Sequence, residues 1–165
     1  MIRSGKLLVV AIVLGLASTG LARADALGTG TAAFNRGDYN TAARLLLPHA
    51  ERGSARAQGM VGFMCATGQG LPQAYDAASY WYRLAAEQGD TTSQYLLGLA
   101  YDKGQGVPQD DVAAYKWLNL AAAHAPKKTR ENFAKLRNAV ASKMSRGQIA
   151  AGQWHALRWP EESPF

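Results

Sequence analysis

The segment Gly68-Gln69-Gly70-Leu71-Pro72-Gln73 returns 36 residues later as Gly104-Gln105-Gly106-Val107-Pro108-Gln109. Residues on both sides repeat at the same offset, and Trp81 is matched by Trp117. Other pairs in this phase are Gln58 with Gln94, Gly62 with Gly98 and Gly53 with Gly89. A period of this length is typical of two-helix repeats that stack into solenoids. The repeated segment therefore predicts an all-α fold, an α/α solenoid of helical hairpins.

The repeated segment is expected to connect the two helices of one hairpin. In the later copy, Asp90 is predicted to cap a helix that ends near Lys103. The glycines then provide the positive φ angles that a helix end and a tight turn need, and Pro108 prevents the helix from continuing. Asp110 or Asp111 caps the second helix. Each unit is therefore predicted to be a helix, a short loop and a second helix.

Small and large side chains alternate in a way that indicates how the helices pack. Trp81 and Trp117 recur in phase, and we expect them to fill the space between successive hairpins. Small residues let helix axes approach closely. They occur at Gly62, Gly98, Ala78 and Ala114.

A third, more degenerate unit precedes the two clear ones. Tyr39 and Ala42 lie one period before Tyr75 and Ala78, although a shorter turn replaces the glycine loop. The first helix of this unit is expected to be short or frayed. The predicted solenoid covers residues 27–126, with units at 27–53, 54–89 and 90–125.

The two clear units resemble the Sel1-like repeat. The pattern is read on Ser93 to Ala122, where Ser, Leu-Gly and Tyr are followed by Gly-x-Gly-Val-Pro-Gln-Asp and then by Ala, Trp and Ala-Ala. The resemblance covers about residues 54 to 124, and the first unit is more similar to an ordinary tetratricopeptide hairpin. It implies an adaptor that holds a peptide or protein partner on the concave face made by the first helices. The family supplies no catalytic motif, so we expect no enzymatic activity.

After the third unit the period is lost, and the remaining chain is predicted to cap the solenoid. Ser145 and Gln148 have the spacing of a capping box, which indicates the start of a last helix ending near Trp159-Pro160. Apolar positions mark the two helices of this cap, namely Phe133, Leu136 and Val140 in the first and Ile149 and Leu157 in the second. The predicted cap is residues 127–159, followed by a tail at 160–165.

The first residues have the features of a secretory signal peptide. Two basic residues precede an apolar run from Leu7 to Ala17, and small residues follow it. We therefore predict a signal peptide at residues 1–26, with cleavage after Ala24 or Ala26, and an exported product that is periplasmic or secreted. The alternative, a retained membrane anchor, is disfavoured because the apolar run is well short of the roughly 20 residues of a spanning helix.

The chain has a formal net charge of +6, and basic residues gather in the predicted cap. Within that stretch Glu131 opposes a set of bases, which are Lys127, Lys128, Arg130, Lys135, Arg137, Lys143 and Arg146. Two interpretations remain open. Either the first five bases form a contact site for anionic lipid or a cell-wall polymer, or the bases form a solvated helix face that keeps the protein soluble.

The residue types that carry chemistry are isolated from one another. His49, His124 and His155 have no second metal-binding side chain at ligand spacing, so no metal site is expected. The Gly-x-Gly loops follow no predicted strand and lack the third glycine of a dinucleotide site. Cys65 occupies the position of Tyr101 in the next unit, and we expect a buried, inert thiol. The sequence thus predicts no catalytic residue, no cofactor and no nucleic-acid partner.

The candidate binding surface is the side of the first helices that faces away from the hairpin interior. If Leu97, Gly98 and Tyr101 point inward, helical geometry turns other residues outward. The candidate partner-binding residues are Thr92, Tyr95, Leu99, Asp102 and Lys103, with Arg56, Phe63 and Thr67 in the preceding unit. Such a set favours an amphipathic groove for an extended peptide or a partner helix. The alternative is that the cap or the first helix folds against its apolar members. The oligomeric state stays open.

Overall fold

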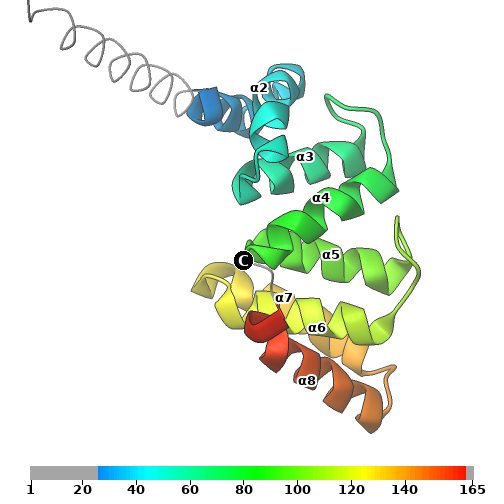
Figure 1. Ribbon diagram of the computed structural model, residues 1–165. Coiled ribbons are helices and arrows are strands. Elements are labelled where there is room, and N and C mark those ends of the chain that lie inside the picture. The colour runs from blue at the N-terminus through cyan, green and yellow to red at the C-terminus, as the bar shows by residue number, and fades with distance from the viewer. Residues whose placement is uncertain (1–25, 163–165) are drawn as a thin grey trace, which may run out of the picture.

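The computed structural model describes residues 26–162, with side chains described from residue 26 to residue 159 (Figure 1). These residues form helices joined by turns, with no strand among them, and the predicted all-α solenoid is confirmed. The predicted signal peptide, apart from its last residue, and the end of the predicted tail lie outside the described residues. No helix within 26–162 is long and apolar enough to cross a membrane.

The described part of the chain begins with a helical segment at residues 26–35. The helices that follow are α2 (Tyr39–Glu51), α3 (Ala55–Thr67), α4 (Tyr75–Glu87), α5 (Thr91–Lys103), α6 (Asp111–His124), α7 (Lys127–Ala141) and α8 (Arg146–Glu162). From α2 to α7 each helix packs against the next one in the chain. Figure 1 shows the resulting stack, which runs from α2 at one end to α8 at the other.

Helices α3 and α5 are built alike because their end signals repeat. Ser54 and Asp90 cap their first turns, accepting hydrogen bonds from the backbone N–H groups three residues on at 3.4 and 2.7 Å. Both helices end at a left-handed glycine, Gly68 or Gly104. These observations confirm the predicted cap at Asp90 and the predicted helix end near Lys103. Of the two candidate caps of α6, Asp110 is the one that accepts bonds from the helix, at 2.9 and 3.0 Å.

The small residues of the repeat allow the close helix contacts that the sequence indicated. A Cβ atom placed on Gly62 would lie 2.7 Å from the ring of Tyr82 and 3.3 Å from the carbonyl oxygen of Ala78. One period later, a Cβ on Gly98 would meet Leu118 at 2.7 Å. The two helices of each hairpin therefore touch through backbone at these points.

Buried glutamines join each hairpin to the one before it. The amide nitrogen of Gln58 donates to the carbonyl oxygen of Ala50 at 3.1 Å, and that of Gln94 donates to Ala86 at 3.2 Å. In both cases the acceptor lies in the last turn of the preceding helix, and it also accepts the backbone N–H of Gly53 or Gly89 at 3.0 Å. The repeated glutamine thus adds a second donor to a helix-end carbonyl group and ties the next hairpin to it.

The helix spacing continues for one unit beyond the clear sequence repeat. Helix α7 begins 36 residues after α5, and Arg130 stands where Gln94 stands one period earlier. Arg130 also donates to a carbonyl oxygen at the end of the preceding helix, that of Ala125, at 3.1 Å. The cap therefore begins as a further first helix, although its sequence no longer matches the repeat.

Helix α8 packs on α6 instead of forming a hairpin with α7. A Cβ on Gly152 would lie 2.8 Å from the ring of Tyr115 and 3.3 Å from the carbonyl oxygen of Val112. Helix α6 is thereby covered by α5, α7 and α8, which explains why seven of its residues are buried.

The predicted capping box at the start of α8 is confirmed. Ser145 N–H donates to Gln148 Oε1 at 2.9 Å, and Gln148 N–H donates to Ser145 Oγ at 3.2 Å. Helix α8 runs on to Glu162, beyond the end expected near residue 160. Leu157, which the sequence suggested for the inner face, is 77% exposed, whereas Ala156 is buried. Close packing through Gly152 selects the small residues for the inner face and turns Leu157 outward.

Candidate partner-binding groove

A groove of about 350 Å³ lies on the face made by the first helices of the three units, which are the segment 26–35, α3 and α5. We call this surface the first-helix face. The groove draws its lining from four elements of the chain. The lining residues are Phe34, Tyr39, Arg56, Gly59, Met60, Phe63, Asp90, Thr92, Ser93 and Leu96. Three of them, Arg56, Phe63 and Thr92, belong to the predicted partner-binding set.

One end of the groove is aromatic. The ring of Phe34 meets those of Tyr39 and Phe63 edge to face, with centroids 5.4 Å apart in both pairs. Tyr39 and Phe63 lie 6.3 Å apart. Edge-to-face contacts of this kind hold rings in a fixed orientation. The first helix thus covers Phe63 in part, and the aromatic wall is rigid before any partner arrives.

The other end of the groove is polar and lies at the start of α5. Asp90 Oδ1 is engaged by the N–H of Ser93 at 2.7 Å. The hydroxyl of Ser93 is fully buried and has no hydrogen-bond partner among the described residues. Arg56 is exposed at the rim, and its guanidinium makes no ion pair or hydrogen bond within 26–159. A cation and a buried hydroxyl are therefore available beside the aromatic wall.

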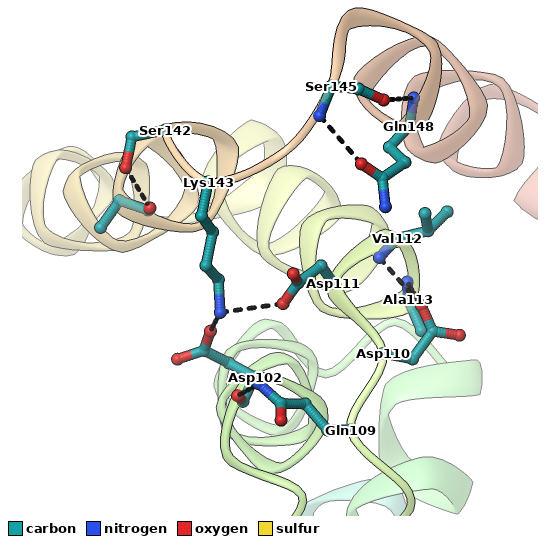
Figure 2. A network of polar contacts seen from close by, with 11 residues as sticks. Asp102, Gln109, Asp110, Asp111, Val112, Ala113, Ser142, Lys143, Ser145 and Gln148 are labelled. Carbon is teal, nitrogen blue, oxygen red and sulfur yellow. Dashed lines mark hydrogen bonds and ion pairs between the residues drawn. The ribbon is translucent and has the colours of Figure 1, made fainter.

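The cap takes up two other members of the predicted set. The ring of Tyr95 stacks on that of Phe133 in α7, with centroids 4.3 Å apart and planes 18° apart. Asp102 accepts a hydrogen bond of 2.7 Å from Lys143, which lies 2.8 Å from Asp111 as well (Figure 2). These contacts match the alternative in which the cap folds against the first helices.

Lys143 is the ionic connection between the cap and the third unit. Its side chain reaches from the α7–α8 loop to the end of α5 and the start of α6 (Figure 2). The hydrogen bond to Asp102 and then that to Asp111 raise the pKa of Lys143 above its ordinary value. Because the lysine side chain is 41% exposed, solvent screens these pairs.

The last three predicted residues lie outside the groove. Leu99 and Lys103 line a smaller hollow of about 110 Å³ beside Tyr82. Thr67 is exposed, and its hydroxyl donates to the carbonyl oxygen of Phe63 at 2.9 Å within its own helix. Whether any of the eight residues contacts a partner stays a prediction.

Several groove residues were missed by the sequence analysis. Phe34 lies in the degenerate first unit, where no repeat identifies its neighbours. Tyr39 is in phase with Tyr75. This match indicated the start of a helix, but it did not indicate that the half-buried ring of Tyr39 lines a groove. Met60 and Leu96 lie one turn or less from predicted residues, so a wider outward sector of each helix includes them.

A second hollow, of about 460 Å³, lies beside the start of α6 and has a mainly polar lining. Its side chains are already committed to helix ends. Asp110 caps α6, Gln148 closes the capping box, and Gln109 donates to the carbonyl oxygen of Asp102 at 3.0 Å. The groove at Phe63 is therefore the better candidate for a binding site, because the guanidinium of Arg56 at its rim makes no hydrogen bond or ion pair among the described residues.

Most of the predicted basic patch is used inside the molecule. Arg130 bonds the end of α6, Lys135 lies 3.0 Å from Glu131, and Arg137 donates to Asn119 at 3.1 Å. Lys127 and Lys128 lie at the very start of α7, where they are exposed and make no side-chain hydrogen bond or ion pair with the rest of 26–159. Because Arg130 and Lys135 remain exposed despite these contacts, whether the five bases contact an anionic partner stays a prediction.

Cys65 lies in the core, and His124 lies at the end of α6. Cys65 is buried as expected, and burial, followed by the charge of Asp76, raises the pKa of its thiol. A raised pKa lowers the fraction of reactive thiolate. His124 Nδ1 lies 3.0 Å from the carbonyl oxygen of Leu120. Residues 26–159 contain no group of three or more metal-binding side chains.

Comparison with known proteins identifies the repeats. A family model described as the Sel1 repeat matches residues 55–90 and 91–125. Among solved structures, the chain is similar to a protective antigen of uropathogenic Escherichia coli strains that displays an SLR fold, with 24% identity and a TM-score of 0.76 over 86% of this chain and 30% of that one.

The chain is also similar to a Sel1 repeat protein from Oxalobacter formigenes, with 31% identity and a TM-score of 0.61 over 66% of this chain and 43% of that one. It thus spans less than half the length of either protein. No curated protein matches the sequence.

Proposed function

We propose that this Sel1 repeat protein is a non-enzymatic adaptor. It binds a peptide or protein partner in the groove at Phe63. Sel1 repeat proteins generally mediate protein–protein interactions, and their fold is typically a non-catalytic scaffold. The specific groove, the absence of enzymatic activity and the place of action are our proposals for this chain.

The observation that supports the groove is its combination of a rigid aromatic wall with an unpaired arginine. Aromatic and arginine side chains contribute most of the binding energy in protein interfaces when they are held in preformed hollows. Elsewhere on the first-helix face, the ring of Tyr95 and the carboxylate of Asp102 are already occupied by the cap. The groove is where such groups remain open to a partner.

The groove can be tested by site-specific photo-crosslinking. A crosslinking amino acid is placed at Thr92, on the groove, or at Lys128, the equivalent position one period later on α7. We expect a discrete protein adduct from position 92 in intact cells, and its loss when Phe63→Ala is added. Circular dichroism checks that the variant keeps its helices. Adducts from position 128 but not from position 92 would contradict the groove.

We propose that the adaptor acts outside the cytoplasm, in the periplasm or as a secreted protein. The support is the sequence of residues 1–26, with its basic start, apolar run and small residues. Cell fractionation with N-terminal sequencing tests this. We expect a mature protein that begins at Asp25 or Leu27 in the exported fraction, and an unprocessed cytosolic chain would contradict export.

A second candidate function is contact with anionic lipid or a cell-wall polymer through Lys127 and Lys128. Both lysines lie in the first turn of α7, where the helix dipole disfavours positive charge by about 0.3–1 kcal/mol each. Their exposure at a site that costs stability is the observation in its favour. Reversing both charges should leave α7 no less stable, and should abolish sedimentation with phosphatidylglycerol vesicles. Unchanged sedimentation would exclude this candidate.

A further inference from the structure

Repeat symmetry shows which side chain is missing from the groove. Helices α3 and α5 are both 13 residues long, and each has a side-chain cap at its start and a left-handed glycine at its end. Gly59 and Tyr95 are therefore equivalent positions, each the fifth residue of its helix. In the third unit the ring of Tyr95 fills the space beside the next first helix and stacks on Phe133. In the second unit glycine leaves that space without a ring.

The groove lies beside Gly59, which is one of its lining residues between Arg56 and Phe63 along α3. A Cβ atom on Gly59 would lie 2.7 Å from Ser93 Oγ, so the start of α5 is in close contact with Gly59 and a ring carried at position 59 would require Ser93 to move. The groove therefore contains no ring from position 59, and its open space is bounded by Arg56, Phe63 and Thr92.

We propose that the groove takes an aromatic side chain of a protein partner, inserted beside Gly59, at whose equivalent position the next unit carries the ring of Tyr95. This inference rests on the proposed adaptor function and deepens it by naming the chemistry of the recognised segment. The partner ring would lie against the rings of Phe34 and Phe63, which line the groove and contact each other.

The lining favours an aromatic side chain over an aliphatic one. Phe34 and Phe63 stand at the groove with their rings fixed, and ring pairs attract beyond the area that they bury. Arg56 at the rim complements the electron-rich face of a ring. The buried hydroxyl of Ser93, which lacks a partner among the described residues, can donate to a carbonyl or phenol oxygen of the bound segment.

The test uses the purified full protein and three acetylated, amidated pentapeptides that differ only in the central residue, which is tyrosine, leucine or alanine. Amide chemical shifts are followed by NMR during titration. We expect the tyrosine peptide to shift the amides of Gly59, Met60 and Ser93, and to bind roughly three- to tenfold more tightly than the leucine peptide. The alanine peptide should not shift these amides.

A tyrosine side chain at position 59 should abolish this binding. The variant combines Gly59→Tyr with Ser93→Ala, which removes the hydroxyl that a side chain at 59 would meet. Ser93→Ala alone should bind the peptide within about threefold of wild type. Gly147→Tyr, the same exchange at an open site of α8, is the matched control and should bind normally. If the double variant does not fold, Phe63→Leu provides the second test and should weaken the tyrosine peptide selectively.

Three outcomes would overturn the inference. Equal binding of the leucine peptide would remove the aromatic preference while leaving the groove as a binding site. If no peptide shifts the amide signals of the groove residues, the aromatic preference is also contradicted. Photo-crosslinking at position 92 would then decide separately whether the groove binds a partner. Self-association that fills the groove and is lost in Trp154→Ala, which removes a ring on α8 that is 58% exposed, would make a second copy of this chain the occupant.

Discussion

At the scale of single residues, the junctions between hairpins depend on buried amides. Gln94 is fully buried, and its nitrogen bonds the carbonyl oxygen of Ala86 at the end of α4. Gln58 does the same at the preceding junction, where Gln88 donates to its Oε1 at 2.7 Å. A repeated polar residue in the core therefore has a structural role at both positions, since it satisfies a carbonyl group that water cannot reach.

Replacing Gln94 with alanine should lower the free energy of unfolding by about 1–3 kcal/mol, because the buried carbonyl oxygen of Ala86 keeps only its backbone donors and the lost side chain leaves a void in the core. Gln109→Ala is the matched control. Gln109 also donates to a helix-end carbonyl, but it is exposed, so its loss should cost no more than about 0.5 kcal/mol. Urea denaturation of both variants gives the comparison. Equal costs would show that the buried amide is not needed at the junction.

At the scale of elements, the repeated loop holds one hairpin against the next. Gly106 has φ of 71°, and a Cβ atom there would overlap the carbonyl group of Tyr75 at the start of α4. Gly70 approaches Tyr39 in the same way one period earlier. The second glycine of each loop therefore provides close contact between units as well as a turn conformation.

Gly106→Ala should therefore destabilise the protein by more than left-handed strain alone. Gly53→Ala is the control, because Gly53 also has positive φ, at 92°, but has open space around it. We expect the control to cost about 1–2 kcal/mol, and Gly106→Ala to cost clearly more because its loop must move away from α4. The comparison is made by thermal and urea unfolding. If the two variants lose the same stability, the close approach to Tyr75 does not contribute.

The elements also show what a single sequence can predict. The ends of α5 and the start of α6 were predictable because Asp90, Asp110 and the loop glycines act within a few residues. The placement of α8 was not, because it depends on which distant surface Gly152 meets. The groove was predictable in part. Arg56, Phe63 and Thr92 follow from helical geometry, whereas the contribution of Phe34 depends on how the degenerate unit folds back.

At the scale of the whole molecule, the cap closes one end of the first-helix face and leaves the other end open. Its ionic contact, Lys143 with Asp102 and Asp111, depends on the charge of the lysine. The pKa of Lys143 is raised in the folded state, so its stabilising effect is present below the ordinary lysine pKa and is lost as the pH rises through the folded value. Wild type and Lys143→Met should differ by less than about 1 kcal/mol at pH 8, and the difference should disappear once the pH has risen through the raised pKa of the folded lysine. A difference that persists in strong base would exclude the ionic origin.

The unequal burial of the helices predicts that the molecule opens from its cap. Helix α7 has one buried residue, Val140, whereas α6 has seven. Local opening follows low burial, so backbone amides of α7 should exchange hydrogen faster than those of α6.

Lys143→Met should speed exchange in α7 by roughly two- to fivefold, because it weakens a contact worth under about 1 kcal/mol, and should leave α3 unchanged. Exchange measured by mass spectrometry on peptides from each helix tests this. If α7 and α3 accelerate together, cap and repeats form one cooperative unit, and Tyr95 is released to a partner only by global unfolding. If α7 alone accelerates, the cap is a separable cover, and a partner that displaces Phe133 from Tyr95 could extend the groove along α5.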